Sequence, residues 1–453
     1  MKRLIHLKIT CLFLLIVTTS CNKEECKYDG GCTETEPEGF MVTTMSEGFM
    51  GSSPNVATIY KTTFNGSAPV GGDWNNPGLG AGQVGTIATP NWNVATIGQV
   101  FGIALDNSNN IYLAATDIYK YDLLFSTTTF GPGGSAGIYK TNVGTTGTTT
   151  TLVTTVTSNA WNYALTNKIP NSGVGIGNSI GNIAFDKTNN QLFVTNLEDG
   201  RIYRLDATTG NVKSVFDPFT LDAPLNGMVA VGERIWGVGV LTQGGITEVY
   251  FARTETALIN SIWSIRLNAA GEFIATPEAG QPNVFNDSAS SSNQEIRDVG
   301  GTQNKISDIE FSCSGKMLIA ERGDPHASKI SEYKKVGATW IITNPFYTGG
   351  IGGNNSAGGV DYGSRETGGV FIKDDIVWAS QNYGTPVNNS YLSYGVQGIS
   401  SSGNTATTNG ATDLFIDANQ STNYKRSIGD VDVFDSSCPC NDVNKNNAAK
   451  GRN

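Results

Sequence analysis

The sequence predicts an all-β protein built as a single β-propeller, for which seven blades are favoured and six are the alternative. The first observation is composition: charged residues make up 15% of the chain, against about 25% in typical soluble domains. Glycine, threonine, asparagine and serine replace them, and these residues favour strands and turns over helices. The second observation is a repeated strand–turn–strand pattern, and the third is a final strand suited to closing a ring.

Five segments repeat the same arrangement of a short apolar strand, a turn with acidic, Asn or Gly residues, and a second apolar strand. They cover residues 102–114, 182–195, 228–238, 309–320 and 370–379. These turn residues are the ones that hairpins favour. Third strands are expected over 59–62, 138–141, 202–206, 262–265 and 330–333. Repeats that cannot bury their own faces are typical of a propeller; two β-sandwiches in tandem are the alternative.

The spacing of the repeats bears on the number of blades. A blade takes about 40–50 residues, whereas two intervals between successive repeats are about 80 residues long. Each long interval therefore holds either a further weak blade or a long insertion. The strand expected at Val431–Phe434 can complete a blade that begins near Met41–Thr44, which would close the ring and remove open sheet edges.

The repeats resemble those of NHL and SMP-30/gluconolactonase-like propellers over roughly residues 45–435. In the SMP-30-like family the asparagine of a Pro-Asn-Gly step is a metal ligand, and Leu225-Asn226-Gly227 after Pro224 is similar to that step. The entries to the first strands also offer Asn182 and Asp308. Because such oxygens suit Ca²⁺, Asn182, Asn226 and Asp308 are candidate metal ligands. Ca²⁺ is the one cofactor that the sequence suggests, and nothing in it requires one.

Residues 1–20 have the pattern of a signal peptide. A basic start is followed by an apolar run over 9–17 and then by small residues, too short to span a bilayer. The next residue, Cys21, resembles the cysteine of a bacterial lipobox, which predicts acylation, for example by palmitate. Lys23-Glu24-Glu25 resembles the surface-export signal of Bacteroidota lipoproteins, which implies an outer-membrane protein facing outward. The alternative for Cys21 is an ordinary cleaved signal peptide followed by an incidental cysteine. The alternative for Lys23-Glu24-Glu25 is a charged tether that carries no export signal.

The chain is expected to divide into a signal peptide (1–20), a lipidated polar tether (21–44), the propeller (45–437) and a polar, disordered tail (438–453). Export to an oxidising compartment permits disulfides. Candidate disulfide cysteines lie near both ends of the chain, and their connectivity stays open: Cys26, Cys32, Cys438 and Cys440. A further cysteine, Cys313, is expected to be a buried free thiol.

Charge and histidine content exclude several functions. Removing Lys2, Arg3 and Lys8 from the 30 basic residues leaves 27 against 40 acidic ones. A nucleic-acid partner is therefore not expected, because phosphate binding needs clustered Lys and Arg. Beyond the signal peptide the only histidine is His326, which rules out zinc sites built from several histidines.

A candidate ligand or partner face follows from propeller topology. The loops after the second strands should emerge on the same face as the entries to the first strands. These loops carry Asn196, Glu198, Asp199, Glu321, Arg322, Asp324, His326, Gln381 and Asn382. The cluster around Arg322 also fits a polar loop with internal ion pairs. No catalytic residue is assigned.

Together these features favour a non-enzymatic lipoprotein, held in the outer membrane by its lipid and displayed on the cell surface. Its propeller would bind a protein partner, as the accessory subunit of an outer-membrane complex, or an extracellular ligand. The first alternative is a calcium-dependent lactonase or esterase of the SMP-30 type. The second is a glycan-binding surface module that uses aromatic residues such as Tyr383, Tyr391 and Tyr394.

Overall fold

The computed structural model describes residues 40–45, 56–62, 73–74, 92–116, 130–142, 149–156, 180–197, 199–219, 229, 233–254, 259–278, 280–286, 292–299, 304–367, 370–385, 393–406, 413–417 and 428–434. The predicted signal peptide and tail lie outside these residues, as do several of the predicted site residues. Those outside are Cys21, Lys23, Glu24, Glu25, Cys26, Cys32, Glu198, Asn226, Tyr391, Cys438 and Cys440.

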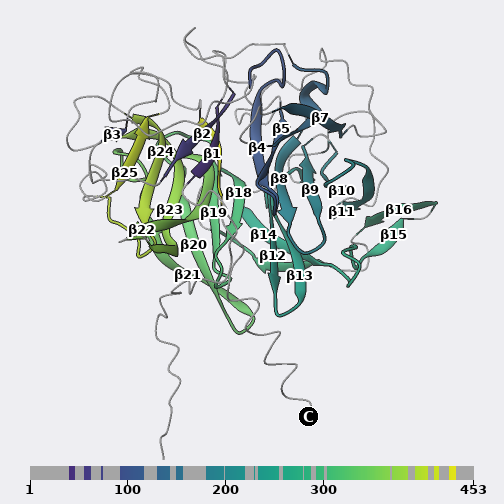
Figure 1. Ribbon diagram of the computed structural model, residues 1–453. Coiled ribbons are helices and arrows are strands. Elements are labelled where there is room, and N and C mark those ends of the chain that lie inside the picture. Colours follow the sequence, from purple (N-terminus) through teal and green to yellow (C-terminus); the bar gives the residue numbers. More distant parts are fainter. Residues whose placement is uncertain are drawn as a thin grey trace, which may run out of the picture.

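Six innermost strands form a closed ring around one axis. They are β4 (Val100–Leu105), β8 (Ile180–Asp186), β12 (Ile235–Gln243), β18 (Lys305–Phe311), β22 (Ser356–Thr367) and β26 (Ile428–Val433). Each contacts the next in the order β26, β4, β8, β12, β18, β22, and β22 contacts β26 again. Figure 1 shows the sheets that extend outward from these strands as the blades of a propeller. The predicted all-β propeller is therefore confirmed, with six blades.

Each sheet continues outward through antiparallel strands. The second strands are β5 (Asn110–Ala115), β9 (Gln191–Asn196), β13 (Ile246–Thr254), β19 (Met317–Arg322), β23 (Val370–Gly384) and β1 (Phe40–Met45). The third strands are β6 (Gly137–Asn142), β10 (Arg201–Asp206), β14 (Asn260–Arg266), β20 (Ile330–Val336), β24 (Ser393–Ser400) and β2 (Ala57–Lys61). The fourth strands are β7 (Thr150–Thr155), β11 (Val212–Asp217), β17 (Asn293–Ile296), β21 (Thr339–Phe346) and β25 (Leu414–Asp417).

The two ends of the chain share one blade, as predicted. Strand β26 pairs with β1 in antiparallel register, with Met41 opposite Val433 and Val42 opposite Asp432. Strand β2 then pairs with the other side of β1. The last strand therefore supplies the innermost position of the blade that the first strands began, so the ring has no open edge at its closure. Residues 40–44, which the sequence assigned to the tether, form most of β1.

The blade count is six because the long intervals hold insertions. Between β14 and β17 the chain forms an extra hairpin, β15 (Thr276–Glu278) and β16 (Gln281–Asn286). This hairpin adds to the outer edge of the neighbouring blade, where β16 pairs in parallel with β11. A short strand, β3 (Asp73–Trp74), extends the blade of β22 in the same way. The hairpin β15–β16 therefore lengthens the interval between the third and fourth repeats without making a seventh blade.

The predicted hairpins over 102–114, 182–195 and 309–320 and all five third strands are confirmed. Two predicted hairpins are wrong. In the third repeat the innermost strand is β12, which turns through Gly244 and Gly245 into β13, so the segment 235–238 is a first strand. In the fifth repeat 370–379 is one continuous strand, β23, paired with β22. Its acidic residues mark a bulge, where Asp374 has φ of 54°.

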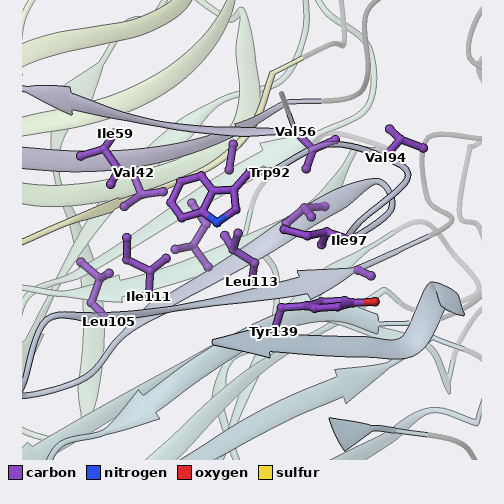
Figure 2. Close-up of a cluster of buried hydrophobic side chains, with 14 of the residues drawn as sticks. Val42, Val56, Ile59, Trp92, Val94, Ile97, Leu105, Ile111, Leu113 and Tyr139 are labelled. Atoms are coloured by element: carbon purple, nitrogen blue, oxygen red, sulfur yellow. The ribbon is translucent and has the colours of Figure 1, made fainter. Parts of the chain in front are cut away.

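Apolar side chains pack between neighbouring blades. Figure 2 shows one such cluster, in which Trp92 lies among Val42 and Ile59 of one blade and Ile111 and Leu113 of the next. The Trp92 indole N–H donates to two threonine hydroxyls, each at 3.0 Å. Burying such side chains contributes about 25 cal/mol per Å² of apolar area. The cluster therefore holds these two blades together without any inter-blade backbone ladder.

Cys313 is disulfide-bonded, so the expected free thiol is wrong. It lies in the turn between β18 and β19, and its backbone N–H donates to Asp374 Oδ2 at 2.8 Å. The predicted disulfide cysteines Cys26, Cys32, Cys438 and Cys440 lie outside the described residues. Within the described residues no helix is long and apolar enough to cross a membrane.

Candidate functional site

Every innermost strand has an irregularity in its pairing near its start. The register shifts between Val100 and Ile103 in β4 and between Ile180 and Ile183 in β8, and equivalent shifts occur in β12, β18, β22 and β26. A bulge turns a side chain away from its ordinary direction. Around the ring the residues at this level alternate between Gly and a short polar residue: Asp430, Gly102, Asn182, Gly237, Asp308 and Gly359.

Two of the polar residues, Asp430 and Asp308, each tie their own innermost strand to the next one in the ring. Asp430 of β26 accepts the N–H of Ile103 on β4 at 3.1 Å, and also the N–H of its own neighbour Val431 at 3.0 Å. Asp308 of β18 accepts the N–H of Val360 on β22 at 2.9 Å. Bulges leave ladder N–H groups unpaired, and buried N–H groups need acceptors. These two carboxylates therefore provide acceptors that the strands cannot provide for one another.

The glycines leave room for these side chains. A Cβ atom on Gly102 would lie 2.5 Å from Asn182 Oδ1, and one on Gly359 would lie 2.5 Å from the Cα of Asp430. Contacts below 3.0 Å do not occur between unstrained atoms, so a larger residue would push the inner strands apart. The alternation of glycine and polar residue is thus a packing requirement of a six-membered ring.

Asn182 and Asp308, two of the three candidate metal ligands, meet at the axis. Asn182 Nδ2 donates to Asp308 Oδ1 and to the Ser307 carbonyl, each at 3.0 Å. Asn182 Oδ1 accepts the N–H of Ile183 at 2.8 Å. A Ca²⁺ ion takes six to eight oxygen ligands, but here an amide nitrogen faces the carboxylate. These residues do not fit a calcium site as they stand, and among the described residues no group of three His, Cys, Asp or Glu could hold a metal.

Asp308 and Asp430 are buried carboxylates at the axis, and neighbouring buried carboxylates disfavour each other's ionisation. Burial raises the pKa of Asp308 to about 7. Burial, followed by the charge of Asp308, holds the pKa of Asp430 well above its usual range. Both shifts favour a protonated form of the pair over the form with two charges.

A second layer of acids lies further along the same strands. Burial, and then the charge of Asp361, raises the pKa of Glu310 well above its usual range. Asp361 accepts the N–H of Val433 at 2.7 Å and that of Tyr362 at 2.6 Å, so it ties β22 to β26 as the first layer ties its neighbours. Asp308, Asp430 and Asp361 thus accept mainly backbone donors.

At the entry of the innermost strands a different group lies at the axis, which we call the cation–aromatic cluster: Phe101, Arg234, Trp236, Lys305 and Arg322. The rings of Phe101 and Trp236 are in edge contact, with centroids 5.2 Å apart. Arg322 lies over the Phe101 ring at 5.4 Å, and its Nη1 donates to the Ile428 carbonyl at 2.6 Å and to that of Ala357. Lys305 is opposite Arg322 in the β18–β19 register. Residues from four strands or their flanks thus meet here.

Most of the predicted face residues within the described part lie at the ends of second strands or just after them. Asn196 is opposite Ile180 at the start of β8, Arg322 is opposite Lys305 at the start of β18, and Gln381 is opposite Ser356 at the start of β22. Their side chains are largely buried rather than presented to solvent: Asn196, Asp199, Glu321, Gln381 and Asn382. Glu321 accepts the N–H of Lys329 at 3.0 Å, and Asn382 donates to the Ser356 carbonyl at 3.0 Å.

Asp199 has an internal role. It accepts hydrogen bonds from the Tyr203 hydroxyl and from the N–H of Arg201, the latter at 3.1 Å. Burial raises the pKa of Asp199 to about 6. Arg201 forms an ion pair with Asp217 at 3.0 Å, and both partners are almost fully buried.

The loop around His326 is held by its own hydrogen bonds. Asp324 Oδ1 accepts the N–H of His326 at 2.8 Å, and His326 Nδ1 lies 2.9 Å from Asn355 Nδ2. The imidazole is in edge contact with Tyr383 at 5.5 Å. Tyr394, which the sequence suggested as a sugar-stacking residue, is fully buried in its blade, so that expectation is wrong.

A two-residue step repeated in the sequence marks the axial position of each innermost strand, although no single occurrence identifies it. All six innermost strands contain Gly, Asn or Asp followed directly by Ile or Val: Gly102-Ile103, Asn182-Ile183, Gly237-Val238, Asp308-Ile309, Gly359-Val360 and Asp430-Val431. Aligning the repeats on this step would have found Asp430 and Trp236. Nothing comparable marks Lys305, because its importance depends on burial.

Comparison with known proteins adds little beyond the fold. No family model and no curated protein matches the chain. Similar solved structures include a chain of a nidogen/laminin complex, at 10% identity and a TM-score of 0.42, covering 88% of this chain and 99% of that one. A gluconolactonase from Xanthomonas campestris is 12% identical with a TM-score of 0.34, covering 70% and 81%. Hydrazine synthase of Kuenenia stuttgartiensis is 11% identical with a TM-score of 0.36, covering 70% and 66%.

At these identities and TM-scores the comparisons carry no conclusion about activity. The propeller architecture rests on the strand pairing and on the closed ring of innermost strands.

Proposed function

We propose that this chain is a lipid-anchored outer-membrane protein, displayed on the cell surface, whose propeller binds a ligand or protein partner rather than catalysing a reaction. The proposal of binding rather than catalysis rests on the hydrogen bonds that the axial carboxylates, Asp308 and Asp430, accept. Both oxygens of Asp308 and of Asp430 accept backbone N–H groups or an amide. A general base or metal ligand needs an oxygen that is free to face its substrate or ion.

The membrane half of the proposal rests on the sequence around Cys21. Acylation there, with Lys23-Glu24-Glu25 as the export signal, would anchor the chain in the outer membrane and present the propeller outside. The start of β1 at Phe40 leaves only a short segment between the lipid and the first blade. The propeller would therefore be held close to the membrane, where an outer-membrane complex could dock.

Two variants test membrane anchoring and surface display separately. Cys21→Ala should abolish incorporation of labelled palmitate and release the protein from membranes. Replacing Lys23, Glu24 and Glu25 by Ala should leave acylation intact but protect the protein from protease added to whole cells. A wild-type protein that stays protease-resistant on intact cells, while a known surface protein is cut, would rule out display.

The binding half is tested on the native lipoprotein. Affinity purification in mild detergent should recover either a stoichiometric outer-membrane partner or a bound ligand. The calcium-dependent hydrolase is the alternative that the same preparation tests, although Asn182 presents its amide nitrogen to Asp308. It predicts a rise in the unfolding temperature on adding Ca²⁺ that disappears in Asn226→Ala, together with turnover of lactone or ester substrates; binding without either result supports the first proposal.

A further inference from the structure

Two buried hydrogen-bond donors in the cation–aromatic cluster have no acceptor. Lys305 is 3% exposed and Trp236 is 5% exposed, and neither Lys305 Nζ nor Trp236 Nε1 has a hydrogen-bond partner. Buried side-chain donors are almost always paired, and a buried charge without a partner is the most costly case. A pair of such donors at one place is therefore a sign that an acceptor belongs there.

Both donors belong to one set of contacts around the axis. The Trp236 ring packs on Phe101 and Leu197, and Phe101 in turn lies under the guanidinium of Arg322. The backbone next to Trp236 abuts the start of β18, since a Cβ on Gly237 would lie 3.2 Å from the Ile306 carbonyl oxygen. Lys305 directly precedes Ile306, so the backbones of Trp236 and Lys305 lie near each other at the start of adjacent innermost strands.

The charge in this cluster is positive. Burial, and then the charge of Arg234, lowers the pKa of Lys305 to about 8. Among the described residues no carboxylate acts on this ammonium. Asp308 and Asp430 are occupied elsewhere, because they accept N–H groups of their own strands and of the neighbouring strands β22 and β4. An anion would supply both the missing charge and the missing acceptor atoms.

We propose that the cation–aromatic cluster binds the oxyanion of a small organic ligand, a carboxylate or a phosphate, with Lys305 Nζ and Trp236 Nε1 as its hydrogen-bond donors. Arg234 and Arg322 add positive charge, and the rings of Phe101 and Trp236 offer an apolar wall to the organic part. The polar side chains of the cluster, those of Lys305, Trp236, Arg234 and Arg322, are donors only, which favours an anion over a metal cation. This inference rests on the proposed binding function and names the chemistry of its ligand.

The test uses the mature full-length chain, made without its lipid and stripped of bound anions by unfolding and refolding in chloride buffer. Unfolding temperatures are measured with succinate, citrate or inorganic phosphate at constant ionic strength, with chloride as the reference. Wild type should gain at least about 2 °C with one of these probes. A shift with phosphate alone indicates a phosphorylated ligand, and a shift with succinate or citrate indicates a carboxylic acid.

Three variants make the result specific. Lys305→Met removes the charge at similar length and should lose the shift, yet unfold in chloride at a temperature no lower than wild type, because an unpaired buried charge is removed. Trp236→Phe keeps the ring contact and should raise the dissociation constant about ten-fold through loss of one donor. Lys334→Met removes an exposed lysine of β20 and should behave as wild type.

Retention of a natural anion is measured directly by ion chromatography of the denatured, natively purified protein, where wild type should release about one anion per chain and Lys305→Met none. The inference fails if wild type neither releases an anion nor shifts, or if Lys305→Met shifts as wild type does. The native pull-down distinguishes this from failure of the proposed function. If the anion tests fail while the native lipoprotein still recovers its partner or ligand, the anion site is wrong and the binding function stands; if the lipoprotein recovers neither, the proposed function fails.

Discussion

Adding one methyl group at Gly359 should open the ring at its closure. The Cβ of Gly359→Ala would lie 2.5 Å from Asp430 Cα, 2.6 Å from Val431 N and 2.7 Å from the carbonyl carbon of Asp430. All three are backbone atoms of the closing strand β26, so no rotamer change can relieve the contact. Overpacking costs about 1–3 kcal/mol when side chains can adjust. With only backbone to move, we expect a loss of about 3 kcal/mol or more.

Two other Gly→Ala variants provide reference values for this loss in the free energy of unfolding. In Gly102→Ala the closest atom is the side-chain oxygen of Asn182, at 2.5 Å, which can move, so the loss should be smaller. In Gly244→Ala the Cβ meets no atom within 4 Å, but φ is 60°. The free energy of unfolding should therefore fall only by the cost of the left-handed backbone conformation, about 1 kcal/mol. Urea unfolding followed by tryptophan fluorescence gives the three free energies of unfolding. A loss in Gly359→Ala no larger than that in Gly244→Ala is incompatible with close packing of β22 on β26.

Three other predictions concern buried charge and covalent bonding. The pKa of Asp308 is about 7 in the folded chain and about 3.9 in an unfolded one. The folded state thus binds more protons between these values, and its contribution to stability falls as pH rises from about 4 to about 7; Asp308→Asn should flatten the urea midpoint across that window. Cys313→Ser should cost about 2–4 kcal/mol, and reductant should lower the midpoint of wild type but not of this variant. Arg201→Met removes the ion pair with buried Asp217 at 3.0 Å and should cost about 3–5 kcal/mol, whereas Arg266→Met, at a half-exposed pair, should cost under about 1 kcal/mol.

The sequence predicted the architecture because blade strands are local patterns. Hairpins such as 182–195 have both strands and the turn within a few residues, and the closing pair was visible as a short strand at each end of the chain. The number of blades depended on where inserted residues go. The hairpin β15–β16 joins the edge of another blade, a tertiary choice that spacing along the chain does not reveal.

The candidate site, like the fold, could be predicted from the sequence only in part. Topology alone placed Asn196, Arg322 and Gln381 at the ends of second strands and brought Asn182 toward Asp308. The sequence does not show whether Asn182 turns its amide oxygen or its amide nitrogen toward Asp308. The oxygen would suit a shared metal ion, whereas the nitrogen, as observed, donates a hydrogen bond. Lys305 reads in sequence as an ordinary surface lysine, since only the fold reveals that it is buried without a partner.

A high-resolution crystal or electron cryo-microscopy structure of the lipoprotein isolated from its own membranes tests ligand binding at the axis most directly. We predict an oxyanion with oxygen atoms about 3 Å from both Lys305 Nζ and Trp236 Nε1, belonging to a small organic molecule rather than to the chain. Water alone between these two atoms, or a carboxylate of this chain in the same position, would remove the axial binding site.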